Sequence, residues 1–209
     1  MALDTVVIGI LRGISPEFFS ALMPAAFAAG LQALEVTINT QRAEEIIAAN
    51  RPLVPAGKWL GMGTIRNLEE AQRAVAAGAM FLVTPNLDLQ VIEFAKSRQI
   101  PVVVGALTPS EVYGAWRAGA AMVKVFPCGA MGGPAYIRAL RGPFEQVPLV
   151  AVGGVGGENL AAYFAAGVNG VGVSAALFGK EALATQDVGR IAENVRTFIG
   201  RCLAGQDHL

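Results

Sequence analysis

One short pattern recurs four times along the chain and constrains its fold more than any other feature. Each copy closes an amphipathic segment with a glycine and precedes an apolar run; the copies are Ala28-Ala29-Gly30, Ala76-Ala77-Gly78, Arg117-Ala118-Gly119 and Ala165-Ala166-Gly167. The four glycines are 48, 41 and 48 residues apart, and each fits the position that ends a helix just before a strand. Because this period is too long for a single strand and helix, each interval is expected to contain two strands and two helices. The repeat therefore predicts eight strand–helix units.

Apolar runs and amphipathic segments locate these units. Strands are expected over 6–11, 32–38, 59–63, 79–84, 100–104, 121–126, 148–152 and 169–173, and helices over 16–29, 41–50, 67–77, 88–97, 109–118, 133–141, 158–166 and 186–203. Ser15, Asn67, Asp88 and Thr108 are expected to cap helices, and Thr108 with Glu111 has the capping-box pattern. Strands that alternate with helices at this spacing favour a parallel sheet. Residues 1–209 are expected to form a single (β/α)8, or TIM, barrel domain, and an open doubly wound sheet is the less favoured alternative.

Composition excludes several classes of partner. The chain carries 16 basic and 16 acidic residues without a basic stripe, so neither nucleic acid nor an anionic membrane is an expected partner. No apolar run approaches the roughly 20 residues of a membrane span, and Met1–Asp4 lacks the basic stretch of a signal peptide. Cys128 and Cys202 suggest no disulfide framework and fit a reducing cytoplasm. A lone histidine, His208, argues against a histidine-dependent triad or a multi-histidine metal site.

Lys124 lies where a lysine has no structural reason to be. It interrupts the apolar run 121–127, which is typical of a buried strand, whereas the other lysines (Lys58, Lys96 and Lys180) fall at expected loop or helix-surface positions. Burial of an ammonium group is costly unless the group is paired or its pKa falls. A lysine with a lowered pKa is a nucleophile at neutral pH. Lys124 is therefore a candidate for covalent chemistry.

Glu35 is the expected partner of Lys124. It is the one acidic residue inside an apolar strand, and side-chain alternation points both Glu35 and Lys124 toward the barrel interior. Chemistry in this fold takes place at the carboxyl ends of the strands, where Arg12, Thr64 and Pro85 also occur. Burial should raise the pKa of Glu35, as a general acid–base requires. The alternative interpretation is a purely structural buried lysine–glutamate pair.

Gly153 and Gly154 follow the seventh expected strand, and Ser174 and Ala175 follow the eighth, where Ser174-Ala175-Ala176 is expected to open a short helix. Barrel enzymes often bind phosphate through backbone amides of these two loops, and glycine lets the backbone approach the anion closely. Ordinary tight turns are the alternative. A dinucleotide-binding loop at 153–157 is disfavoured, because no acidic residue ends a following strand.

Five motifs, in this order, resemble the family of 2-keto-3-deoxy-6-phosphosugar-acid aldolases: Glu-Val-Thr-Ile-Asn (35–39), Gly-Met-Gly-Thr (61–64), Val-Thr-Pro-Asn (83–86), Lys-Val-Phe-Pro (124–127) and Val-Gly-Gly-Val (152–155). The resemblance implies a class I, metal-independent aldolase without a cofactor. Lys124 would form an imine with the C2 ketone of the substrate and Glu35 would transfer protons. The products would be pyruvate and D-glyceraldehyde 3-phosphate. The resemblance further places Arg12 and Thr64 at the pyruvate carboxylate, Pro85 and Phe126 in the pocket wall, and Gly153, Gly154, Ser174 and Ala175 at the phosphate.

Within that family, Val152-Gly-Gly, Thr84-Pro-Asn and the arginine in Ile10-Leu-Arg-Gly are similar to the phosphogalactonate branch. Ser174-Ala175 departs from it, because that branch tends to have Gly-Ser there. The gluconate epimer and 4-hydroxy-2-oxoglutarate are alternative substrates. A non-catalytic barrel that binds a phosphorylated metabolite and a metal-dependent pyruvate lyase are alternatives of other classes. Relatives are commonly trimers, so the resemblance also implies a homotrimer.

Overall fold

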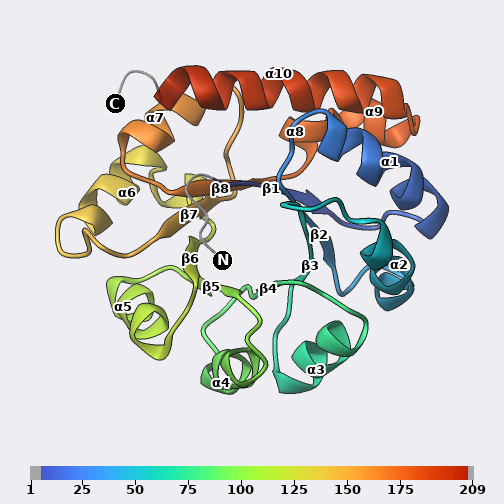
Figure 1. Ribbon diagram of the computed structural model, residues 1–209. Helices are drawn as coiled ribbons and strands as arrows, with labels where there is room; N and C mark the ends of the chain where they lie inside the picture. The colour runs from blue at the N-terminus through green and yellow to red at the C-terminus, as the bar shows by residue number, and fades with distance from the viewer. Residues whose placement is uncertain (1–5, 207–209) are drawn as a thin grey trace.

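The computed structural model describes residues 6–206, so the expectations for Met1–Asp4 and His208 lie outside the described residues. Eight parallel strands pair in chain order, and β1 pairs with β8 to close a barrel (Figure 1). The strands are β1 Val6–Leu11, β2 Ala33–Thr37, β3 Trp59–Gly63, β4 Leu82–Val83, β5 Val102–Ala106, β6 Met122–Val125, β7 Leu149–Val152 and β8 Gly170–Val173. The (β/α)8 barrel is thus confirmed, and the open-sheet alternative is wrong.

Helices surround the barrel on its outside (Figure 1). They are α1 Pro16–Ala28, α2 Ala43–Asn50, α3 Leu68–Ala76, α4 Leu89–Ser97, α5 Pro109–Ala118, α6 Pro134–Arg141, α7 Leu160–Ala165, α8 Ala175–Phe178, α9 Lys180–Ala184 and α10 Val188–Gln206, with 3-10 turns η1 Arg51–Leu53 and η2 Gly129–Met131. All four expected N-caps accept a hydrogen bond from the first turn of their helix, and the Thr108–Glu111 capping box is present. Among these described helices, none is long and apolar enough to cross a membrane.

The recurring glycines have the backbone conformation that their position requires. The φ angles of Gly30, Gly78, Gly119 and Gly167 are 105°, 96°, 103° and 97°. Positive φ angles of this size cost free energy for any residue that has a side chain, whereas glycine adopts them readily. The prediction that each glycine ends a helix before the chain enters the next strand is therefore confirmed.

Three parts of the fold differ from the expected elements. The strand expected over 79–84 is reduced to β4, although the amide of Met80 still donates to Leu60 and that of Thr84 to Val103. β5 begins and ends two residues later than expected, because Pro101 has no amide hydrogen to donate to the ladder. Between β8 and α10 the chain forms two short helices, of which α9 was not expected, and Gly179, with a φ of 88°, separates α8 from α9.

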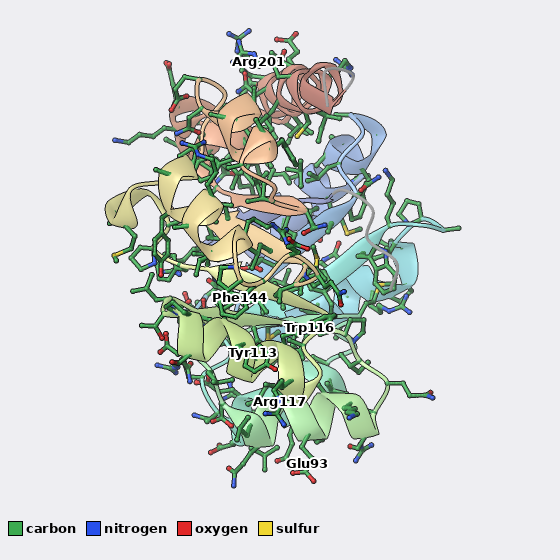
Figure 2. All side chains as sticks on the ribbon, turned by 90° about the vertical axis from the view of Figure 1, so that its left-hand side faces the viewer. Glu93, Tyr113, Trp116, Arg117, Phe144 and Arg201 are labelled. Atoms are coloured by element: carbon green, nitrogen blue, oxygen red, sulfur yellow. The ribbon has the colours of Figure 1, made fainter. Side chains whose placement is uncertain are left out.

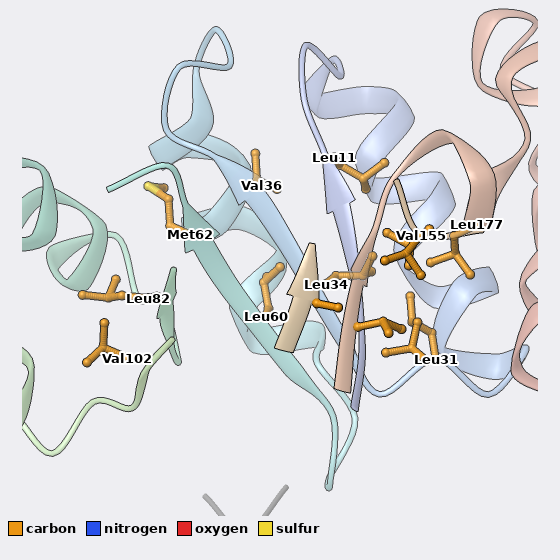
Figure 3. Packing of buried hydrophobic residues seen from close by; sticks show 14 of the residues in the cluster. Leu11, Leu31, Leu34, Val36, Leu60, Met62, Leu82, Val102, Val155 and Leu177 are labelled. Atoms are coloured by element: carbon orange, nitrogen blue, oxygen red, sulfur yellow. The ribbon is translucent and has the colours of Figure 1, made fainter. Parts of the chain in front are cut away.

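The core has two layers, which the alternation along each strand generates. Ala33 and Met122 contribute to a cluster inside the barrel, whereas Leu34, Val36 and Val123 belong to the larger cluster between barrel and helices. Figure 3 shows part of this outer layer, with Leu34 and Val36 beside side chains of neighbouring strands and helices. The predicted assignment of strand faces is confirmed, so the inner face is the one that can build a site at the barrel mouth.

An aromatic cluster lies on the outer surface of α5 and of the loop after α6. The ring of Tyr113 stacks on that of Phe144 with centroids 5.8 Å apart, and the guanidinium of Arg117 lies 5.8 Å from the Tyr113 centroid. Figure 2 shows these side chains with Trp116 on one face of the molecule. The sequence analysis did not identify this cluster, and its residues do not line the barrel pocket.

Candidate active site

A pocket of about 310 Å³ opens at the carboxyl ends of the strands. All of the predicted site residues line it: Arg12, Glu35, Thr64, Pro85, Lys124, Phe126, Gly153, Gly154, Ser174 and Ala175. The prediction missed further lining residues from the inner faces and following loops, namely Ile10, Val152, Val155, Gly172, Val173 and Ala176. A larger hollow of about 440 Å³ between α9 and α10 shares none of these residues and has mixed charges on its wall. The barrel pocket is where titratable groups, glycines and apolar walls converge.

Lys124 is 7% exposed in the middle of β6. Its ladder neighbours are Gly105 on β5 and Val150 on β7, and its Nζ lies 5.2 Å from the centroid of the Phe126 ring. Within the described chain, no hydrogen bond or ion pair involves its amine. Burial lowers the pKa of Lys124, the Arg12 charge lowers it further, and the Glu35 carboxylate opposes both. The amine is thus shifted toward the neutral, nucleophilic form.

Glu35 is 2% exposed and accepts no hydrogen bond from any described residue. Burial raises the pKa of its carboxyl, while the charges of Lys124 and Arg12 act in the opposite direction. The pKa values of the acid and the amine therefore move toward each other. A pair of this kind can exchange a proton at low cost, which suits general acid–base chemistry better than a fixed structural ion pair.

The glycines of Gly61-Met62-Gly63 make room for two different side chains. A Cβ built at Gly61 would lie 2.5 Å from the Phe81 ring, and one at Gly63 would lie 2.6 Å from the carboxyl carbon of Glu35. Gly61 thus accommodates the packed interior of the barrel, whereas Gly63 accommodates the candidate acid–base. The sequence identified the motif, but only the structure assigns these two roles.

Gly63→Ala is expected to lower kcat at least tenfold, because the new methyl group displaces the Glu35 carboxyl. Gly61→Ala is the matched control: overpacking against Phe81 should destabilise the fold by about 1–3 kcal/mol but leave turnover per folded molecule within a few-fold of wild type. Urea unfolding and active-site titration of both variants would separate the effects. Equal losses of kcat per folded molecule would contradict the distinction.

Thr64 has a φ of 60°, which is uncommon for any residue with a side chain and an outlier for a β-branched one. Such a conformation costs about 1–3 kcal/mol and persists where its surroundings enforce it, often at functional sites. The amide of Ile65 donates to Val83 and fixes the chain just after Thr64. This backbone turn brings Thr64 to the pocket that Arg12 also lines, and the Arg12 side chain is exposed.

The loop after β7 is held open toward the pocket. Gly153 and Gly154 have φ angles of 87° and 78°, and the Gly129 amide donates to the Gly153 carbonyl. Asn159 spans the loop: its Oδ1 accepts from the Gly156 amide and its Nδ2 donates to the Gly154 carbonyl. Asn159 was expected inside a helix, and its role was missed because it depends on how the loop folds back.

Ser174 and α8 follow β8, the strand paired with β7, and line the pocket beside the β7 loop. Ser174 is exposed and makes no side-chain capping bond to α8, so its hydroxyl is available to a ligand. The predicted short helix after β8 is present and starts at Ala175. In the described part of the chain, no group of three or more His, Cys, Asp or Glu side chains is placed to hold a metal ion.

Comparisons with known proteins agree with this geometry. Residues 6–194 match the family described as KDPG and KHG aldolase. The chain is 34% identical to the 2-dehydro-3-deoxy-6-phosphogalactonate aldolase of Escherichia coli K12, over 92% of each chain. It superposes on a native KDPGal structure with a TM-score of 0.89 and 33% identity, over 96% of each chain. A KDPG aldolase from Legionella pneumophila, with pyruvate captured as a covalent carbinolamine, superposes with a TM-score of 0.86 and 27% identity over 94% and 95% of the two chains.

Proposed function

The chain belongs to the KDPG and KHG aldolase family, and from this we propose that it is a class I aldolase. Its proposed reaction cleaves 2-dehydro-3-deoxy-6-phospho-D-galactonate to pyruvate and D-glyceraldehyde 3-phosphate. One observation carries the proposal: Lys124 and Glu35 are buried in one pocket, neither has a hydrogen bond or ion pair with another described residue, and their pKa values are shifted toward each other. Arg12 and the loop of Gly153 and Gly154 line the same pocket.

The proposed reaction begins at the lysine. The neutral amine of Lys124 attacks the C2 ketone of the substrate, and Glu35 protonates the oxygen, which leaves as water when the iminium forms. The Glu35 carboxylate then takes the proton of the C4 hydroxyl. The C3–C4 bond breaks, its electron pair enters the iminium to give an enamine, and the aldehyde leaves. Protonation at C3 and hydrolysis release pyruvate and restore the free amine.

The rest of the pocket would hold the two ends of the substrate. We assign the carboxylate next to the ketone to Arg12 and Thr64, since a guanidinium and a hydroxyl pair well with a planar carboxylate. Pro85 and Phe126 provide apolar parts of the pocket wall. The phosphate is assigned to the backbone amides of Gly153 and Gly154, with Ser174 and Ala175 from the neighbouring loop. Ser174 can supply its hydroxyl although the branch tends to have Gly-Ser at this point.

The galactonate epimer is the proposed substrate, because the arginine at position 12 and Val152-Gly153-Gly154 are similar to that branch. We expect kcat/KM for this epimer to exceed that for the gluconate epimer and for 4-hydroxy-2-oxoglutarate at least tenfold. Pyruvate release measured with a coupled dehydrogenase would test all three substrates. A preference for the gluconate epimer would contradict the branch assignment. Release from none of them would favour a non-catalytic barrel that binds a phosphorylated metabolite.

The proposed mechanism requires no metal or coenzyme, so the purified enzyme should keep its activity in EDTA; loss of activity would favour the metal-dependent lyase instead. The family resemblance also supports a homotrimer, and the small number of cysteines fits a location in the reducing cytoplasm. Light scattering on the purified chain would measure the assembly. These proposals concern partners and location, and the chemistry at Lys124 does not depend on them.

A further inference from the structure

The loop that carries Arg12 is anchored by the core at one end only. Arg12, Gly13 and Ile14 follow β1; Ile14 is 8% exposed and packs in the core, whereas Arg12 and Gly13 are exposed, and Gly13 has a φ of 67°. A Cβ built on Gly13 would meet nothing within 4 Å, so no side chain packs against the loop at Gly13 itself. Among the described residues, one hydrogen bond reaches these three positions: the Gly13 amide donates to Thr40 Oγ1 over 3.0 Å.

The acceptor of this bond is itself firmly held. Thr40 is 4% exposed, and its Oγ1 lies 3.1 Å from Oγ1 of Thr37, which is 1% exposed. The Thr40 amide donates to the Thr37 carbonyl over 2.8 Å, and the amide of Ile38 donates to Gly63 on β3. The turn after β2 is therefore tied to the barrel by backbone bonds and a buried hydroxyl pair.

Thr37 is the last residue of β2 and lies two positions after Glu35, on the same inner face. The strand that carries the proposed acid–base therefore also anchors the loop that carries the proposed carboxylate-binding arginine. A ketone acid bound by Arg12 must present its C2 carbon to Lys124 and its oxygen to Glu35. Misplacement of a binding group by about 1 Å can be costly to such a reaction.

We propose that Thr40 is a positioning residue, which through the Gly13 amide places Arg12 to bind the carboxylate of a 2-keto acid. This inference rests on the proposed function. It predicts that the hydroxyl of Thr40 matters for ketones that carry an adjacent carboxylate and not for neutral ketones. A residue that only stabilised the barrel would affect both kinds of ketone alike.

The test compares Thr40→Val, which keeps the shape but removes the hydroxyl, with Thr40→Ser, which keeps the hydroxyl. Each folded protein is incubated with pyruvate or with acetone, reduced with borohydride, and the adduct on Lys124 is measured by mass spectrometry. In Thr40→Val, the pyruvate concentration for half-maximal trapping should rise about tenfold, the effect typical of a lost buried hydrogen bond. The acetone trapping rate should stay within about twofold, and Thr40→Ser should restore the response to pyruvate.

Two further variants make the result specific. Thr84→Val removes another buried threonine hydroxyl at the barrel mouth, one that accepts from the Gly105 amide, and any effect should be equal for the two ketones. Arg12→Gln combined with Thr40→Val should trap pyruvate no worse than Arg12→Gln alone, because the two residues act in series.

Three results would overturn the proposal: normal pyruvate trapping by Thr40→Val, an equal loss for acetone, or a further loss in the double variant. Absence of any adduct in the wild-type protein would instead refute the proposed function. The outcomes of the two hypotheses are therefore distinguishable. Thermal unfolding of every variant identifies any that fails to fold. If Thr40→Val does not fold, Thr40→Ala, which also removes the hydroxyl, replaces it in the single and double variants, and Thr40→Ser remains the control that keeps the hydroxyl.

Discussion

Replacement of Lys124 by methionine is expected to abolish aldol cleavage while the protein remains folded. Methionine has a similar length and fits an apolar strand, but it cannot attack a ketone. The loss in kcat should be on the order of 10⁴-fold or more, as for removal of the nucleophile in other covalent enzymes. Lys124 is buried without a hydrogen bond or an ion pair within the described chain, so its removal breaks neither, and a methionine side chain can still pack beside the Phe126 ring. We expect the melting temperature to stay unchanged or to rise by a few degrees, which is typical when a functional site carries a local cost in stability.

Borohydride reduction in the presence of pyruvate, followed by peptide mass mapping, measures the chemistry directly. The wild-type enzyme should carry one reduced pyruvate adduct on the peptide that contains Lys124, and Lys124→Met should carry none. Lys96→Met is the matched control, because Lys96 is exposed on α4 and faces solvent. It should be labelled and active like the wild type. An adduct on another lysine, or appreciable turnover by Lys124→Met, would refute the assigned nucleophile.

Glu35→Gln is expected to lower kcat by about 10²–10⁴-fold, the usual contribution of general acid–base catalysis, with a much smaller change in KM. Glutamine preserves the shape of the side chain but cannot take up or release the proton. Glu70→Gln is a matched control at the other buried acidic residue, which pairs with Arg66 on the outside of the barrel. That change should lower the melting temperature and leave kcat unaltered. A normal kcat in Glu35→Gln would exclude Glu35 as the acid–base.

The pH dependence of pyruvate trapping should shift in opposite directions in Glu35→Gln and Arg12→Gln. In the wild-type protein the trapping rate should rise with pH as Lys124 loses its proton. Glu35→Gln removes a negative charge that favours the ammonium form of Lys124, so the pKa of Lys124 falls and the rise in rate moves to lower pH. Removal of the Arg12 charge by Arg12→Gln has the opposite sign and moves the rise to higher pH. Trapping rates measured from pH 5 to pH 10 would show both shifts, and shifts in the same direction would contradict the electrostatic assignment.

Periodicity in the sequence predicted the large-scale features of this protein. The four glycines repeat because each ends a helix in a left-handed conformation that glycine adopts readily, and this local requirement is visible in the sequence. The inward direction of Glu35 and Lys124 follows from the two-residue alternation of a strand, which is also local. Placement at the barrel mouth follows from the parallel arrangement, since all strands end on the same side. These regularities explain why every predicted site residue lines the pocket.

Strand lengths were less predictable, because they depend on which backbone amides donate hydrogen bonds to which carbonyls of the neighbouring strand. β4 has two residues although its apolar run is longer, and β5 starts only after Pro101, the residue that precedes it. Asn159 and Thr40 were missed for a related reason. Each contacts a loop whose path is set by the folded backbone, and neither carries a chemical group that is unusual in its sequence context.

The sequence by itself determined the number of repeating units and the faces of the strands, and it identified Glu35 and Lys124 as the proposed reactive pair, because each rests on local periodicity or on a charge within an apolar run. Only the tertiary structure decided how those groups are held: that Gly63 accommodates the Glu35 carboxyl, and that Thr40 reaches Gly13, 27 positions away. The physical reason is that such contacts depend on the approach of chain segments to within a few ångströms. That approach is set by closure of the whole barrel and by the packing of its interior, and neither is encoded in the pattern of a single segment.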